Sequence, residues 1–343
     1  MKKRVLALCL AIMMFTWALT ACGNSTTPSD AASSANSGAP GGNDGKENVF
    51  RVGFVNIDNS DQACNPAMLE FEKYVESEDF AQSVGADSVE VLTADSAKDI
   101  EKQTTNVETM LTKGVDMMFI IGVDTEGNTI SVESCNAEGI PVFMVGTEAS
   151  GGDWKFIGFN EVELGQRQGQ WCAENLPDNT KICYLEGTPG REASILRKQG
   201  FEEGIADRTD LEIISSQTGE FETAAAMQVT EDWIQTYGDE IGCVVAADSK
   251  MIVGAVEALK GADMNDDVIT CGVVHLGEED GYMIKDGDCS YSVFVYWPSI
   301  GTLCGQIAER VYNGESVEQE TYIELQDMTA DNFDEIVASV SSD

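Results

Sequence analysis

The run VDMMFII, residues 115 to 121, is almost entirely apolar, and it determines how the segments around it are interpreted. A strand with apolar side chains on both faces is typical of a parallel sheet that helices cover on both sides. A helical pattern precedes it over 100–113, and another follows over 125–138 and ends at Gly139 as a left-handed cap. This order predicts strands joined by right-handed helical crossovers.

The same alternation continues in both directions from this run. Upstream, strands are expected over 50–57 and 89–92 with a helix over 68–81 between them, and the next strand downstream covers 140–145. After Phe156-Ile157-Gly158 the rhythm starts again. The expected elements are then helix 161–175, strand 181–185, helix 192–206, strand 212–216, helix 223–237, strand 242–247, helix 250–260, strand 268–271, helix 278–285, strand 290–296, helix 299–313 and strand 321–325. Two successive halves of this kind predict an α/β fold with two similar, Rossmann-like lobes.

The N-terminus indicates export. A basic start and an apolar run over 5–19 lead to Leu19-Thr20-Ala21-Cys22, which has the form of a lipobox. An ordinary secretory signal that happens to end in cysteine is the alternative. Residues 22–48 are rich in Ser, Gly, Asn, Ala and Thr and cannot bury enough apolar surface to fold. We therefore predict a signal peptide at 1–21, a lipid on Cys22, a flexible tether at 22–48, and a folded part held outside the cytoplasm at a membrane surface.

Composition restricts the partners. The chain has 60 acidic and 20 basic residues and a formal net charge of −40, so nucleic acid and anionic lipid are poor partners. The acidic surface either keeps the protein soluble or attracts cationic ligands.

The cysteines beyond Cys22 are scattered along the chain, without a C-x-x-C pair. Cys183, Cys243, Cys271 and Cys289 lie in apolar runs and are interpreted as core residues. Disulfide pairing cannot be deduced from the spacing of the cysteines.

Motifs for enzymatic chemistry are missing from the sequence. It contains one histidine and neither a G-x-S-x-G elbow nor a phosphate-binding glycine loop. We expect no enzyme activity, no cofactor and no metal.

Polar and aromatic side chains follow many of the predicted strands. Ligands in such sheets bind beyond the carboxyl ends of the strands, where carboxylates and amides can bond vicinal hydroxyls and aromatic faces can cover apolar ones. The candidate ligand-binding residues are Asn56, Asp58, Asp61, Asp124, Glu148, Asn160, Arg191, Asp248, His275, Tyr296 and Trp297. Asp124 and Asp248 fit helix caps equally well. His275 is a hydrogen-bonded loop residue or, less simply, a proton shuttle.

Several phrases, in order, resemble the type I periplasmic binding proteins, the ribose- and galactose-binding group of transport receptors. They are Arg51-Val52-Gly53-Phe54, Asn65-Pro66, Lys113-Gly114-Val115-Asp116, Gly139-Ile140-Pro141-Val142, Glu186-Gly187-Thr188-Pro189-Gly190, Arg197-Lys198-Gln199-Gly200-Phe201, Ala247-Asp248, Gly254-Ala255-Val256-Glu257-Ala258-Leu259 and Asn313-Gly314-Glu315. The resemblance implies two lobes joined by three strands, which close on a small ligand and present it to a membrane permease. It divides the chain into an N-lobe of 49–158 with 297–322 and a C-lobe of 159–296 with 323–343.

Departures from the family pattern fall at the ligand positions. Where the sugar receptors carry aromatic residues after Asn-Pro, this chain has Ala67 and Met68; where they carry an Asp-Arg pair, it has Gly146-Thr147-Glu148. Ile195 replaces a family arginine, and the Asp after the ninth strand is replaced around His275, whereas Asp248 matches. The resemblance thus implies a pocket in the family's place with different chemistry.

Two functions follow as hypotheses. The first is a monomeric receptor that captures a sugar or sugar-like solute and delivers it to an ABC importer. The second is a sensor on the same fold that signals to a membrane kinase or chemoreceptor. Modified sugars, sugar alcohols, nucleosides and cationic metabolites all remain possible ligands.

Overall fold

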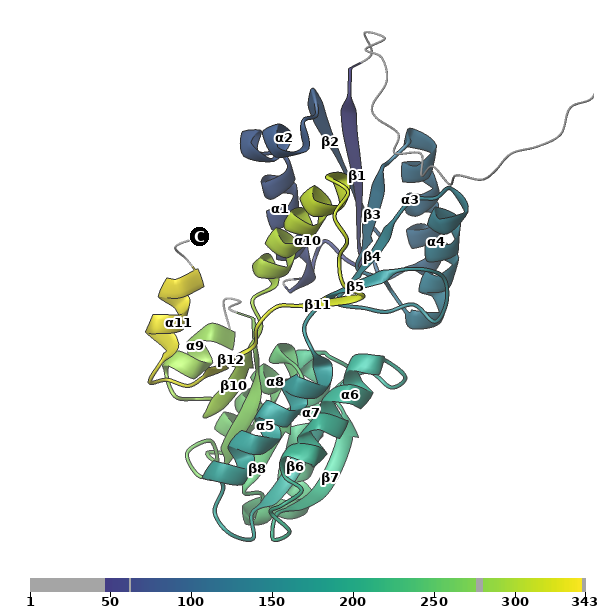
Figure 1. Cartoon of the computed structure of the whole chain (residues 1–343). Coiled ribbons are helices and arrows are strands. Elements are labelled where there is room, and N and C mark those ends of the chain that lie inside the picture. The colour runs from purple at the N-terminus through teal and green to yellow at the C-terminus, as the bar shows by residue number, and fades with distance from the viewer. Residues whose placement is uncertain (1–46, 62, 276–279, 341–343) are drawn as a thin grey trace, which may run out of the picture. The chain divides into compact units, whose positions relative to one another are not determined.

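Within residues 47–61, 63–275 and 280–340, which the computed structural model describes, the strands form two six-stranded sheets (Figure 1). The predicted signal peptide at 1–21, the lipidated Cys22 and all of the tether except its last two residues lie outside the described residues. None of the described helices is long and apolar enough to span a bilayer.

The first sheet has the strand order β11-β5-β4-β3-β1-β2, with every neighbouring pair parallel. Its strands are β1 (Val49–Asn56), β2 (Ser88–Asp95), β3 (Met117–Ile120), β4 (Val142–Val145), β5 (Lys155–Gly158) and β11 (Glu320–Tyr322). The described side chains of β3 and β4 are all buried, because helices cover both faces of the sheet. This burial explains why the sequence is apolar without alternation at these two strands.

Helices cover this sheet in two groups (Figure 1). On one face lie α3 (Ile100–Lys113) and α4 (Thr125–Ala137), and on the other α1 (Cys64–Val75), α2 (Glu78–Val84) and α10 (Trp297–Tyr312). Beneath α3 and α4, Val107, Met110 and Val132 pack in one apolar cluster with Met118 and Ile120 of β3. We call this sheet with its helices the N-lobe.

The second sheet has the order β12-β10-β9-β8-β6-β7, parallel except for the β10–β12 pair. Its strands are β6 (Lys181–Glu186), β7 (Glu212–Thr218), β8 (Cys243–Ala246), β9 (Ile269–Val274), β10 (Tyr291–Phe294) and β12 (Gln326–Met328). The helices that accompany it are α5 (Glu161–Asn175), α6 (Glu192–Gly204), α7 (Thr223–Tyr237), the short 3-10 helix η1 (Gly238–Glu240), α8 (Ser249–Gly261), α9 (Asp280–Lys285) and α11 (Phe333–Val340). We call this sheet with its helices the C-lobe.

The two helices α5 and α6 approach each other unusually closely. A Cβ on Gly165 would lie 2.0 Å from the carbonyl oxygen of Arg197, and a Cβ on Gly200 would lie 2.1 Å from that of Val162. Only glycine fits at both contacts, and the close packing fixes where α6 directs Arg197.

The chain passes between the lobes three times, from β5 to α5, from β10 to α10 and from β11 to β12. Two parallel-dominated sheets, each with its helices, confirm the predicted α/β fold of two lobes. Helices α3, α5 and α7 have the predicted bounds.

One predicted helix was wrong in extent. The pattern over 68–81 is two helices, α1 and α2, because Ser77 adopts an extended backbone between them. Its hydroxyl donates to the Tyr74 carbonyl at 2.7 Å and accepts from the Phe80 amide at 3.2 Å, which ends one helix and caps the next. Strand β12 and helix α11 were not predicted, and residues 278–279 of the helix expected at 278–285 lie outside the described residues.

The eight cysteines of the described residues are all unpaired. Cys183, Cys243, Cys271 and Cys289 are buried, which confirms their interpretation as core residues. Cys64 differs from the rest because it is partly exposed, at the start of α1.

Candidate functional site

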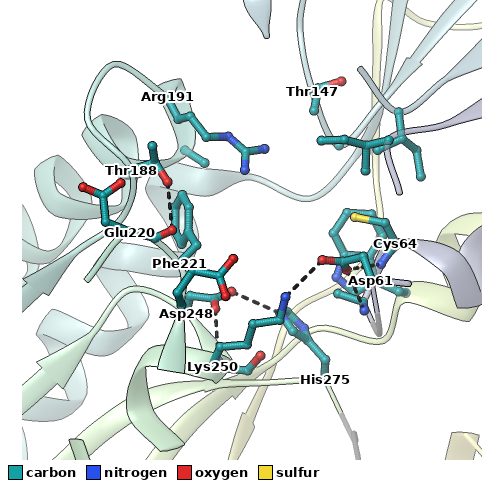
Figure 2. Close-up of a pocket in the computed structure, with 18 of the residues that line it drawn as sticks. Asp61, Cys64, Thr147, Thr188, Arg191, Glu220, Phe221, Asp248, Lys250 and His275 are labelled. Carbon is teal, nitrogen blue, oxygen red and sulfur yellow. Dashed lines mark hydrogen bonds and ion pairs between the residues drawn. The ribbon is translucent and has the colours of Figure 1, made fainter. Parts of the chain in front are cut away.

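A cavity of about 370 Å³ is lined by residues of both lobes (Figure 2). Its walls follow the carboxyl ends of four strands in each lobe: Ile57, Lys98, Ile121 and Gly146 after β1 to β4, and Thr188, Phe221, Asp248 and His275 after β6 to β9. The remaining lining residues are Asp61, Ala63, Cys64, Val123, Thr147, Phe159, Glu161, Arg191, Ala193, Arg197, Glu220, Glu222, Thr223, Ser249, Lys250, Val253 and Trp297. The volume suits a small molecule of monosaccharide size.

Asp61 of the N-lobe and Lys250 of the C-lobe meet at this cavity. The Lys250 ammonium donates to Asp61 Oδ2 at 3.2 Å, while the amides of Ala63 and Cys64 donate to Oδ1 at 2.9 and 3.0 Å. Burial acts to raise the pKa of Asp61, but these amides and the ammonium hold it below its ordinary value. Asp61 is therefore a carboxylate at neutral pH, and its Oδ1 is already occupied by two backbone amides at the start of α1.

Asp248 has two roles at the start of α8. Its carboxylate accepts the Lys250 amide at 3.0 Å as the helix cap, and Oδ2 lies 3.7 Å from Nε2 of His275. Burial acts to raise the pKa of Asp248, yet His275 and Arg197 together bring it below its ordinary value. Nδ1 of His275 lies 3.2 Å from the Val295 carbonyl, which orients the ring.

Arg197 and Glu161 form a buried ion pair at the floor of the cavity. Nε of Arg197 lies 2.5 Å from Oε2 of Glu161, and a second nitrogen donates to the Ala247 carbonyl at 2.5 Å. Their side chains are only 7% and 13% exposed, so neither charge could be buried here without the other. The pair holds α5, α6 and the end of β8 together.

Phe221 presents its ring to the cavity from an unusual backbone. Glu220 and Phe221 both have left-handed φ angles, 58° and 57°, which is costly for residues with a Cβ. A Cβ on Gly187 would lie 1.9 Å from the Phe221 ring, so glycine is needed there to make room for it. The guanidinium carbons of Arg191 and Arg197 lie 5.4 and 5.8 Å from the ring centroid, within cation–π range.

Trp297 contributes an apolar wall at the start of α10. Its ring lies edge-on to Phe159, with centroids 5.9 Å apart, and fills the space beside Gly146, where a Cβ would come within 2.9 Å of it. Its buried Nε1 has no hydrogen-bond partner.

Five of the candidate residues line the cavity: Asp61, Arg191, Asp248, His275 and Trp297. That they contact a ligand stays a prediction. The other six have identifiable roles elsewhere. Among them, Asp124 and Asn160 cap α4 and α5 by accepting the amides of Gly127 and Glu163. Asp58 accepts from Ser60 and lies near Lys98.

The remaining three do not line the cavity either. The buried Asn56 amide donates to the Asp58 carbonyl and to Asn59. Tyr296 lines a separate groove with Tyr74 and Tyr322. Glu148 faces Glu192 of the C-lobe, and its pKa is raised to about 7. Burial is the largest cause; the hydrogen bond and charge of Glu192 and the charges of Glu320 and Glu161 add to it.

The candidate set missed Cys64, Lys98, Glu161, Arg197 and Phe221, all of which line the cavity. An aromatic residue in the polar loop Gly219-Glu220-Phe221-Glu222 was a signal for Phe221. Arg197 lies inside a helix, and nothing in the local pattern indicates that its guanidinium reaches the cavity. Among the described residues, no group of three or more His, Cys, Asp or Glu side chains is arranged to hold a metal ion.

Residues 52–316, most of the chain, match the family model described as the periplasmic binding protein domain. The chain therefore belongs to the periplasmic binding protein family, in its type I, ribose- and galactose-binding group. Membership implies an extracytoplasmic location and solute binding rather than catalysis.

Particular relatives agree with this assignment. The chain is 29% identical over 319 residues to the ribose import binding protein RbsB of Bacillus subtilis, covering 92% of this chain and 96% of the relative. It is 25% identical over 258 residues to a xylitol-binding protein of Mycolicibacterium smegmatis, covering 74% and 73%. An ABC transporter solute-binding protein from Bacillus halodurans with bound myo-inositol superposes with a TM-score of 0.75 at 26% identity, covering 86% and 99%.

Proposed function

We propose that this protein captures one small polyhydroxy solute in the cavity between its lobes and delivers it to an ABC importer. The observation that carries the proposal is the cavity itself, with four strand ends from each lobe around it. A solute held there contacts both lobes at once, so it stabilises the arrangement in which they meet, which is the basis of hinge closure. The names of the relatives, which bind ribose, xylitol and myo-inositol, support a sugar or cyclic polyol.

The chemistry of the walls agrees with such a ligand. Asp248, Arg191 and Lys250 offer charged acceptors and donors that can each bond vicinal hydroxyls, and Phe221 offers an apolar face for a sugar ring. Without the family's aromatic pair after Asn-Pro and its Asp-Arg pair, ribose itself fits the wall less well than a modified sugar.

A thermal-shift screen of residues 23–343, which omit the signal peptide and Cys22, tests the proposal. The panel contains sugars, polyols, nucleosides, amino acids and polyamines. A ligand at a hundredfold excess over its dissociation constant adds about 2.7 kcal/mol to the free energy of unfolding. We expect stabilisation by sugars or polyols and not by the other classes; stabilisation only by amino acids or polyamines contradicts the proposal.

We further propose that the mature protein is a monomer tethered to the membrane through a lipid on Cys22. The support is the lipobox Leu19-Thr20-Ala21-Cys22 and the polar tether after it. Metabolic labelling with a fatty-acid analogue checks this point. The wild-type chain is expected to be labelled and Cys22→Ser unlabelled; equal labelling of both contradicts lipidation at Cys22.

A further inference from the structure

Arg191 differs from the other cationic side chains of the cavity. The other three each lie next to a carboxylate, in the pairs Arg197–Glu161 at 2.5 Å, Lys250–Asp61 at 3.2 Å and Lys98–Glu222 at 3.7 Å. Across the described part of the chain, the Arg191 guanidinium has neither an ion-pair partner nor a side-chain hydrogen bond. No carboxylate of the described lining pairs with it directly, although five carboxylates line the cavity: Asp61, Glu161, Glu220, Glu222 and Asp248.

The position of Arg191 is defined by its surroundings. Its amide donates to the Thr188 carbonyl at 3.2 Å at the start of α6, and its guanidinium lies over the Phe221 ring at 5.4 Å. Figure 2 shows the guanidinium pointing into the space between the two walls, whereas the Glu220 carboxylate points away from it. Burial, with the charge of Asp61, raises the pKa of the Cys64 thiol well above its ordinary value, and the Arg191 charge opposes that rise, so its field reaches the opposite wall.

An arginine held in this way has a preferred partner. Its planar fork of five N–H donors matches a carboxylate or a phosphate, which can accept two parallel hydrogen bonds. On the opposite wall the acid of the cavity lining, Asp61, pairs with Lys250 at 3.2 Å. Gly146 and Thr147 follow β4 there, and the Thr147 hydroxyl already accepts the Gly122 amide at 2.8 Å.

We propose that Arg191 binds an anionic group carried by the solute, and that this group is a carboxylate, so that the ligands are sugar acids rather than neutral sugars. The proposal rests on the proposed function and deepens it. A single guanidinium without an ion-pair partner matches a monoanion, whereas a phosphate carries close to two negative charges at neutral pH. The five carboxylates of the cavity lining oppose that second charge. The acidic surface of a chain with net charge −40 opposes the surplus charge of a dianion further.

Isothermal titration of residues 23–343 with matched pairs tests this inference. The pairs are galacturonate with galactose, gluconate with glucose, and glucose 6-phosphate as the phosphate arm. At least one sugar acid is expected to bind 10- to 100-fold more tightly than its neutral parent and more tightly than the phosphate. Arg191→Gln is expected to remove that preference, so that the sugar acid loses at least tenfold more affinity than its neutral parent.

Arg310→Gln is the matched control, because it removes an exposed guanidinium of α10 that pairs with Glu315 far along the helix from the cavity. It is expected to bind every compound like the wild type. A neutral sugar that binds as tightly as its acid, or an Arg191→Gln variant that weakens both equally, overturns the inference and leaves the receptor function standing. Tighter binding of the phosphate overturns the carboxylate assignment. No binding by any of these compounds overturns the inference, and the thermal-shift screen with neutral sugars and polyols then decides the proposed function separately.

Discussion

The loop after the second strand has the same backbone in both lobes but places different side chains at the cavity. After β2, Ala97 and Lys98 have φ angles of 49° and 58°; after β7, Glu220 and Phe221 have 58° and 57°. The hydrogen bonds correspond as well, since the amides of Ser96 and Gly219 bond to the ends of β1 and β6 at 2.8 Å. The N-lobe uses this turn to present a lysine, and the C-lobe uses it to present an aromatic ring.

Over the rest of the cavity the contrast between the two walls is reversed. The N-lobe contributes mostly apolar or small groups, namely Ile57, Ala63, Cys64, Ile121, Val123 and Gly146. The C-lobe contributes Glu161, Arg191, Arg197, Asp248 and Lys250. Similar halves of the fold thus provide different chemistry. We expect the C-lobe to make most of the hydrogen bonds to a solute, with Phe221 and the apolar residues of the N-lobe covering its apolar faces.

The largest expected effect concerns the buried ion pair of the C-lobe. Arg197→Met leaves the Glu161 carboxylate buried without its partner, so we expect the free energy of unfolding to fall by about 3 to 5 kcal/mol. Arg51→Met is the N-lobe counterpart; it breaks a half-exposed pair with Glu90 and is expected to cost less than about 1 kcal/mol. Urea denaturation measures both. If both variants lose a similar free energy of unfolding, the buried ion pair of the C-lobe contributes no more to stability than the half-exposed pair of the N-lobe, and the prediction is wrong.

The second effect separates helix capping from ligand contact. Asn is as good an N-cap as Asp, so Asp248→Asn retains the start of α8 but removes a negative charge from the cavity. We expect the solute to bind about 10- to 100-fold more weakly, with unfolding changed by less than about 1 kcal/mol. Asp124→Asn, at the cap of α4 away from the cavity, serves as the control and is expected to leave binding unchanged. Titration calorimetry decides; equal affinity of Asp248→Asn and wild type limits Asp248 to a cap.

The third effect concerns the carboxyl groups that face each other across the lobes. The pKa of Glu148 is raised from 4.5 to about 7, so the folded state holds this proton more tightly than the unfolded state does. The resulting stability is present below about pH 4.5 and is lost as the pH rises to about 7. Solvent screening reduces it to about 1 kcal/mol.

Glu148→Gln is expected to remove this part of the pH dependence. The relevant groups are Glu192 on α6, Glu320 on β11 and Glu161 on α5, and all three are acidic. Thermal unfolding of wild type and Glu148→Gln from pH 4.5 to 7.5 provides the comparison. Parallel curves over that range mean that Glu148 titrates normally.

The smallest effect tests the shared turn. Replacing a residue by glycine normally destabilises a protein by about 0.5 to 1 kcal/mol, but a left-handed position reverses part of that cost. We expect Ala97→Gly and Glu220→Gly to be neutral or to stabilise by up to about 1 kcal/mol, each by a similar amount. Denaturation midpoints report the change, and a loss in one lobe alone indicates that the two turns are not equivalent.

The sequence predicted most strands because buried parallel strands appear as continuous apolar runs, as at β3 and β4. It also located the strand ends, and therefore Asp61, Asp248 and His275. Tyr296 and Trp297 were both candidates, but adjacent residues point in different directions, and Trp297 is the one that lines the cavity.

Other features of the site depend on packing that no local pattern shows. Arg197 reaches the cavity because glycines bring α5 and α6 together, and Phe221 turns inward because two residues without special sequence signals adopt left-handed φ angles. Helix caps and ligand contacts use the same residue types, so the sequence alone does not show that Asp124 and Asn160 cap helices, which their hydrogen bonds in the structure do show.

A crystal structure of residues 23–343 with the solute identified in the screen tests the central claim most directly. We predict the solute between the two walls, with its polar groups bonded mainly to Arg191, Asp248 and Lys250. Its apolar faces are expected to lie against Phe221 on one wall and against Ile121 and Val123 on the other. A solute bound outside this cavity, or one whose hydrogen bonds come mainly from the N-lobe, would contradict it.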